Sequence, residues 1–148
     1  MMDCQDKKIR KHIVHYIRKH SMDLSEWKYT KVDDAHELVL KRTEIAPGEF
    51  PIVSFYLSEN SFYLLTTRRL AGFYYRLKVE FSPTELKQSD FGNFKGYGNK
   101  HIEVVTFEIE GGNYNHRLEF ETGKASMAPI YYFRWWGIKY PILDKLTD

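Results

Sequence analysis

Apolar and basic residues recur along the first part of the chain with the period of a helix. The apolar ones lie three or four positions apart: Ile9, Ile13, Val14, Tyr16 and Ile17. Residues at this spacing share one side of a helix, so the pattern predicts an amphipathic helix that docks this side on the rest of the chain. Asp6 is the expected N-cap, and the helix is expected to end near His20.

From Trp27 onward, apolar and polar residues alternate in short runs, which is the pattern of β-strands. A short candidate at residues 27–31 is followed by seven further runs, at residues 36–45, 50–57, 61–67, 70–75, 77–81, 101–110 and 114–121. Residues 85–88 fit either a helical turn or a strand, and the Gly- and Asn-rich residues 91–99 are expected to form a loop.

The runs 101–110 and 114–121 form the clearest hairpin. Gly112 and Asn113 between them are a favoured two-residue turn. A turn centred there places apolar side chains on a buried face and polar ones on the outer face. It gives the cross-strand pairs Val105 with Phe120, Phe107 with Leu118, Glu108 with Arg117, and Glu119 with Thr106.

The last part of the chain is predicted to be a second helix. Ser126 is the expected N-cap, the helix begins at Met127, and a break or kink is expected near Tyr140. One stripe follows helical spacing: Met127, Ile130, Tyr131, Arg134, Trp135 and Ile138. The aromatic residues of this helix are expected to pack on the core rather than on a membrane.

The order of these elements predicts an α+β fold. About seven short antiparallel strands suggest a strongly bent sheet or partial barrel, whose open end the last helix covers. The 148 residues show no repeat or linker and fit one domain. It consists of a basic N-terminal helix at 1–22, a β-sheet body at 23–124 and a C-terminal helix at 125–148.

Residues 62–70 read FYLLTTRRL in one-letter code. This segment resembles the strand and turn signature of bacterial PH-like and GRAM-like domains, and the final aromatic helix is similar to their capping helix. The resemblance implies a seven-strand bent sheet, a capping helix and a binding role without catalysis. Phosphoinositide binding is not expected, because only Lys41 and Arg42 lie near the first loop and Pro47, Gly48 and Glu49 supply no basic cluster.

Composition narrows the class of protein further. The lone Cys4 forms no internal disulfide, and the chain shows neither a signal peptide nor an apolar run long enough to cross a bilayer, so a cytoplasmic location is expected. Aromatic residues make up 16% of the chain, a share that favours strands and interfaces. Residues 1–22 hold six basic and two acidic side chains, whereas the remainder is nearly neutral.

No residue pattern points to catalysis, a metal or a cofactor. Cys4 lies at a terminus without a positioned base, and His12 and His15 alone make a poor metal site. The glutamates of the hairpin are expected to be exposed surface residues: Glu108, Glu110, Glu119 and Glu121. A cleft that holds His36, His101 or His116 beside a buried carboxylate would instead indicate an enzyme.

The sequence therefore favours a non-catalytic module that binds another protein. The concrete form we expect is a bacterial immunity protein that neutralises a cognate toxin domain. The expected contact residues lie in the aromatic loop and the preceding basic turn: Phe91, Phe94, Lys95, Tyr97, Arg68 and Arg69. The alternative is a PH-like module that binds acidic lipid or RNA through a basic helix face, formed by Lys7, Lys8, Arg10 and Lys11.

Overall fold

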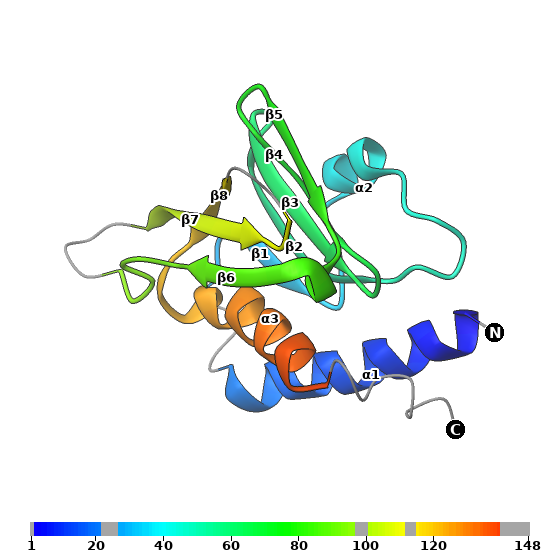
Figure 1. The fold of residues 1–148 in the computed structure, drawn as a ribbon. Coiled ribbons are helices and arrows are strands. Elements are labelled where there is room, and N and C mark those ends of the chain that lie inside the picture. The colour runs from blue at the N-terminus through cyan, green and yellow to red at the C-terminus, as the bar shows by residue number, and fades with distance from the viewer. Residues whose placement is uncertain (1, 22–26, 97–100, 112–114, 140–148) are drawn as a thin grey trace.

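The chain forms two antiparallel sheets and three α-helices in a computed structural model that describes residues 2–21, 27–96, 101–111 and 115–139 (Figure 1). The helices are α1 (Met2–His20), α2 (Glu37–Thr43) and α3 (Met127–Lys139). The strands are β1 (Thr30–Val32), β2 (Pro51–Ser58), β3 (Ser61–Thr66), β4 (Leu70–Tyr74), β5 (Leu77–Phe81), β6 (Leu86–Asp90), β7 (Ile102–Ile109) and β8 (Asn115–Glu121).

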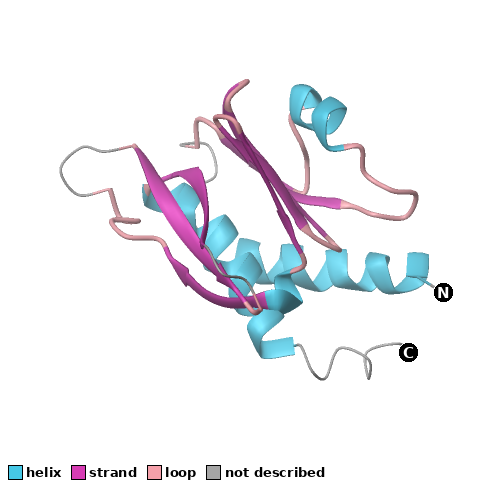
Figure 2. Cartoon of the chain, turned by 45° about the horizontal axis from the view of Figure 1, so that its top comes forward, coloured by secondary structure: helices cyan, strands magenta, loops and turns pink. Residues whose placement is uncertain are grey.

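The strands divide into a five-stranded sheet, in the order β1-β2-β3-β4-β5, and a three-stranded sheet, in the order β6-β7-β8. Figure 2 shows these sheets as separate layers, with α1 and α3 along one side of them. The predicted α+β class with antiparallel strands is therefore confirmed. The strands lie in two sheets that do not close into a barrel, instead of one bent sheet of about seven strands.

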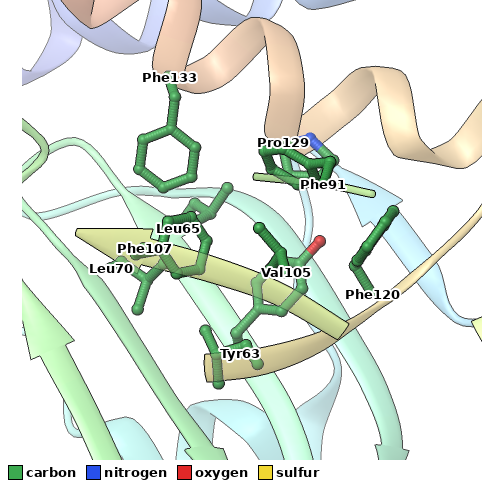
Figure 3. A pocket seen from close by; sticks show the side chains of 10 residues that line it. Tyr63, Leu65, Leu70, Phe91, Val105, Phe107, Phe120, Pro129 and Phe133 are labelled. Carbon is green, nitrogen blue, oxygen red and sulfur yellow. The ribbon is translucent and has the colours of Figure 1, made fainter. Parts of the chain in front are cut away.

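The main core lies between the two sheets and is completed by α1 and α3. The predicted docking of α1 is confirmed, since Ile9, Ile13, Val14 and Ile17 are all buried in this core. Figure 3 shows the centre of the core, where Phe133 of α3 points toward Phe107 of β7. The cavity there measures only about 10 Å³ and its lining is almost wholly apolar, so it offers no room for a ligand.

Residues 36–45 were expected to form a strand, but they contain helix α2 instead. The alternation of Leu38 and Leu40 suggested one buried strand face, yet Leu38 is 52% exposed. Glu, Leu, Lys and Arg favour helix, and the turn of helix buries Val39 against Phe62 and Leu64 on the outer face of β3. β3 is consequently buried on both faces.

The predicted β7–β8 hairpin exists, but its register differs by two residues. Each β7 residue faces the β8 residue that lies two positions earlier in the chain than the one expected from a turn at Gly112 and Asn113. The same side chains stay buried, because a shift of two residues preserves the faces of a strand. The observed pairs are Val105 with Leu118, Phe107 with His116, Glu108 with Asn115, and Val104 with Glu119.

Glu121 is buried at the end of β8, contrary to its predicted place on the surface. Its carboxylate accepts hydrogen bonds from the backbone N–H groups of Lys28 (2.8 Å) and Tyr29 (2.9 Å) and from the hydroxyl of Thr30 (2.8 Å). Three donors compensate for the loss of water around the charge. The side chain thereby joins the smaller sheet to the first strand of the larger one.

Asp6 lies inside α1, which begins at Met2, and is therefore not the N-cap that the sequence suggested. Its buried carboxylate accepts two hydrogen bonds from Arg68, at 3.2 Å from Nε and 2.9 Å from Nη2. Arg68 also donates to the carbonyl of Pro47 (3.2 Å). This bidentate pair attaches α1 to the turn between β3 and β4.

The neighbouring Arg69 forms a second ion pair on the other side of the same turn. Its Nε donates to Glu49 (3.0 Å), whose side chain is only 1% exposed. Burial alone would raise the pKa of Glu49, but hydrogen bonds from Arg69, Thr66 and the backbone N–H of Ala46 outweigh it and lower that pKa. Glu49 is thus held as a carboxylate within the fold.

The C-terminal helix begins at Met127, as predicted. Ser126 does not cap it, since its hydroxyl lies in the preceding 3₁₀ turn and donates to the carbonyl of Gly123 (2.6 Å). The expected break near Tyr140 lies outside the described residues.

We expect the substitution Arg69→Ala to destabilise the fold by about 3 kcal/mol, because it leaves the Glu49 carboxylate buried without its cation. Arg76→Ala is the matched control, since Arg76 is exposed near the adjacent β4–β5 turn and should change stability by under about 0.5 kcal/mol. Urea unfolding measures both. Equal losses in the two variants would contradict this role of Arg69.

The depressed pKa of Glu49 predicts a specific response to acid. Below its ordinary value of 4.5, the unfolded chain takes up a proton that the folded chain resists, so stability falls as the pH falls. Glu49→Gln lacks this contribution. Its unfolding midpoint, although lower at neutral pH, should therefore decline less steeply below about pH 4.5 than that of the wild type. Parallel declines in chemical denaturation would show that Glu49 does not carry this dependence.

Candidate functional site

A wide groove lies between β6 and α3. It has a volume of about 930 Å³. Figure 1 shows β6 running beside α3, with the loop that follows β6 at one end. We call it the β6–α3 groove, and its lining residues are Pro83, Leu86–Asp90, Phe91, Gly92, Phe94, Lys95, Met127, Ile130, Tyr131, Phe133, Arg134, Gly137 and Ile138.

One wall of the groove is a side of α3 that the core covers only in part. The core takes the other side of the helix, where Tyr132, Phe133, Trp135 and Trp136 are buried. The stripe that follows helical spacing in the sequence lines the groove, except for Trp135: Met127, Ile130, Tyr131, Arg134 and Ile138. Ile130 and Tyr131 are half-buried against the core, and Tyr131 also contacts the rings of Tyr16 and His20 of α1, whereas Arg134 and Ile138 are exposed.

The opposite wall is the outer edge of β6. All five residues from Leu86 to Asp90 line the groove. A groove against one face of a strand would be lined by alternate residues, because successive side chains point to opposite faces. Consecutive lining residues therefore indicate that the groove follows the strand's edge. β6 is also terminal in its sheet, and β7 is its only partner among the described strands.

Charged side chains stand at the rim of the groove, and all four are exposed: Lys87, Asp90, Lys95 and Arg134. Lys87 Nζ lies 3.2 Å from Glu108, and Asp90 accepts a hydrogen bond from the N–H of Gly92 (2.9 Å). Arg134 and Lys95 lie over aromatic rings of the groove, those of Tyr131 (5.0 Å) and Phe94 (5.9 Å). The rim is therefore net positive above an apolar floor.

The residues of the aromatic loop that were expected to contact a partner have different positions. Phe91 is buried, with its ring edge-on to those of Phe107 and Phe120, so it belongs chiefly to the core. Phe94 is half-buried and Lys95 exposed, and both line the groove. Tyr97 lies outside the described residues.

Arg68 and Arg69 lie away from the groove and are engaged within the fold. Arg68 binds Asp6, and Arg69 binds Glu49 and, at 3.2 Å, Glu80. The side chains are 27% and 22% exposed, respectively. Contact of either arginine with a partner stays a prediction, and its guanidinium already has a structural role.

The predicted basic helix face borders a separate depression of about 420 Å³ on α1, lined by Lys7, Arg10, Lys11, Val14, His15, Arg18 and Asp33. Lys8 is not among its lining residues. Arg10 is held in place by a hydrogen bond from its Nε to Asp33 (2.8 Å) and lies over the ring of Phe50 (5.0 Å). The hydrogen bond to Asp33 raises the pKa of Arg10 against the smaller effect of burial.

Three histidines were candidates for chemistry, and one of them lies next to a serine. His36 Nδ1 is 2.7 Å from Ser54 Oγ, but Ser54 is fully buried and no substrate reaches it. The pKa of His36 is lowered, mainly by burial and secondly by the positive charge of Lys31. A neutral ring that shares a hydrogen bond with the serine hydroxyl fits a structural role at the start of α2. His101 is exposed, and His116 lies against Phe81.

The buried carboxylates have other partners: Asp6 binds Arg68, Glu49 binds Arg69, and Glu121 binds residues 28–30. Where the structure is described, it holds no group of three His, Cys, Asp or Glu side chains placed to bind a metal ion. Within the same residues, no helix has the length and apolar character to cross a membrane.

Comparison with known proteins gives no family for this chain: no protein-family model, curated protein or solved structure matches it.

Proposed function

We propose that this chain is a non-catalytic module that binds another protein in the β6–α3 groove. The observation that carries the proposal is the exposed part of the α3 stripe, at Arg134 and Ile138, which lies beside a strand edge without a described partner. An apolar floor within a charged, exposed rim is the usual composition of a protein interface. Monomeric proteins seldom leave such a surface without a use.

The arrangement of polar groups favours binding over catalysis. The rim charges of the groove are exposed, and Ser54, the partner of the half-buried His36, is fully buried. General acid or base catalysis needs a titratable group within reach of a substrate and with a suitable pKa. The groove instead offers surface area and shape, which are the requirements of docking.

The order of elements supports the proposal of a PH-like fold. Strands β2 to β8 provide seven antiparallel strands, and α3 follows them. The resemblance of residues 62–70 implies this order and a binding role. A bacterial immunity protein, which occupies a cognate toxin domain, is the concrete form that we propose for a small binding module of this kind.

Ile138→Glu should abolish capture of the partner, because it places a charge against the apolar floor of the groove. Leu38→Glu is the matched control: the two side chains are 56% and 52% exposed, but Leu38 lies on α2 outside the groove. We expect Ile138→Glu to weaken binding at least about tenfold and Leu38→Glu to leave it unchanged. The measurement is quantitative pull-down from an extract of the source cell and with the product of the adjacent gene.

A second candidate function rests on the depression in α1. Arg10, held by Asp33 among Lys7, Lys11 and Arg18, makes a positively charged concavity that suits the phosphates of RNA or of acidic lipid headgroups. Insertion of α1 into a bilayer would not contribute, because its apolar side is buried in the core.

If this second function holds, replacing Lys7, Lys11 and Arg18 by Gln should weaken binding to single-stranded RNA or to phosphatidylserine vesicles and flatten its salt dependence. Arg10 is kept because of its bond to Asp33. The control is Lys41→Gln with Lys78→Gln, which changes exposed lysines away from α1. Fluorescence anisotropy with labelled RNA and vesicle co-sedimentation distinguish the two ligands. Unchanged affinity for both would contradict this function.

A further inference from the structure

We propose that the occupant of the β6–α3 groove is an extended, acidic segment of the partner that adds to the outer edge of β6 as a new antiparallel or parallel strand. This inference rests on the proposed protein-binding function. It specifies the conformation and the chemistry of the bound segment.

The edge of β6 determines the conformation. Alternate residues of an edge strand direct their N–H and C=O groups away from the sheet, and these groups pair readily with another extended chain. The groove follows this edge along all five residues of β6. The one irregularity in pairing with β7 lies between Leu86 and Gln88, so Gln88, Ser89 and Asp90 remain in regular register. A bound helix would leave these backbone groups without partners, whereas a strand would pair with them.

The two walls of the groove are similar in length. The α3 stripe from Met127 to Ile138 covers eleven residue steps, or roughly 17 Å at the rise of an α-helix. The five residues of β6 cover four residue steps, or roughly 13 Å. The groove therefore matches a bound segment of about five residues, laid along β6 and packed against α3.

The α3 wall determines which side chains the segment carries. Successive residues of a strand point in opposite directions, so every second side chain faces the helix. There it meets Met127, Ile130 and Ile138, which are apolar and not fully buried. The segment is consequently expected to have an apolar residue at alternate positions.

The rim determines the charge. Arg134 and Lys95 lie over aromatic rings, and no acidic partner is recorded for either side chain in the described structure. Lys87 is near Glu108, and the carboxylate of Asp90 is occupied by the N–H of Gly92. Acidic residues at the positions of the segment that reach the rim would complement the two cations.

The charge also argues against a second copy of this chain as the occupant. The β6 of another copy reads LKQSD, with one Lys and one Asp, and brings no net negative charge to the rim. An antiparallel pair of such strands would therefore gain little from Arg134 and Lys95. The observations favour a different protein with an acidic segment.

The first experiment selects peptides with the intact chain as bait. A phage library of random dodecapeptides is the probe, and enriched peptides are measured by fluorescence anisotropy. We expect sequences that combine apolar residues at alternate positions with Asp or Glu. Ile138→Glu should weaken their binding at least about tenfold, while the control Leu38→Glu leaves it unchanged. Arg134→Glu should also weaken peptide binding, and replacing an acidic residue of the peptide by Lys should restore binding to that variant. The charge control is Arg117→Glu, because Arg117 is exposed on β8 and lies outside the groove.

The second experiment tests strand addition itself by methylating the peptide backbone one nitrogen at a time. N-methylation removes a donor, so alternate positions should lose about tenfold or more in affinity and the intervening ones should lose little. Loss on Ile138→Glu with an even response to methylation would overturn strand addition and leave the groove as a docking site. Enriched peptides that ignore Ile138→Glu, or the absence of any enriched peptide, would overturn the groove proposal as well. A dimer in light scattering that Ile138→Glu dissociates would identify a second copy as the occupant and overturn the acidic segment.

Discussion

The turn between β3 and β4, which carries two adjacent arginines, holds all three helices against the larger sheet. Arg68 binds Asp6 of α1, and Arg69 binds Glu49 while donating to the carbonyls of Thr43 (3.1 Å) and Glu44 (3.3 Å) at the end of α2. The carbonyl of Thr66, at the start of the same turn, accepts a hydrogen bond from Tyr132 of α3 (2.7 Å). Because a buried carboxylate is costly without its cation, the turn and the helices depend on one another.

The position of α3 makes the groove a permanent feature of the fold. Its core side carries four large aromatic side chains, Tyr132, Phe133, Trp135 and Trp136, and these hold the helix in place while Arg134 and Ile138 remain exposed. Both walls of the groove are regular elements, a helix and a sheet strand. In the proposed binding function, such a site would be largely formed before the partner arrives, so binding would lose less conformational entropy than it would on a mobile loop.

The sequence predicted local features well and relations between distant elements poorly. Periodicity correctly indicated the buried side of α1, the start of α3 and the existence of the last hairpin. It wrongly predicted a strand at α2, because Leu38 and Leu40 are two positions apart, as on one face of a strand. It also predicted a hairpin register that differs by two residues from the observed one, because it assumed a turn at Gly112 and Asn113. It did mark the stripe of α3, but spacing alone does not reveal which side of the helix the sheets cover. The ion pairs of Arg68 and Arg69 join residues up to 62 positions apart, a distance at which no local pattern operates.

Glu121 has a consequence for the order in which the molecule assembles. The residues that it binds, 28–30, are more than 90 positions earlier in the chain. During synthesis, the five-stranded sheet can therefore form before its first strand acquires these contacts, which wait until β8 has left the ribosome. Contacts between such distant residues slow folding, because a long loop must close before they form. The nascent larger sheet accordingly lacks the contacts of Glu121 with residues 28–30 until the smaller sheet joins it.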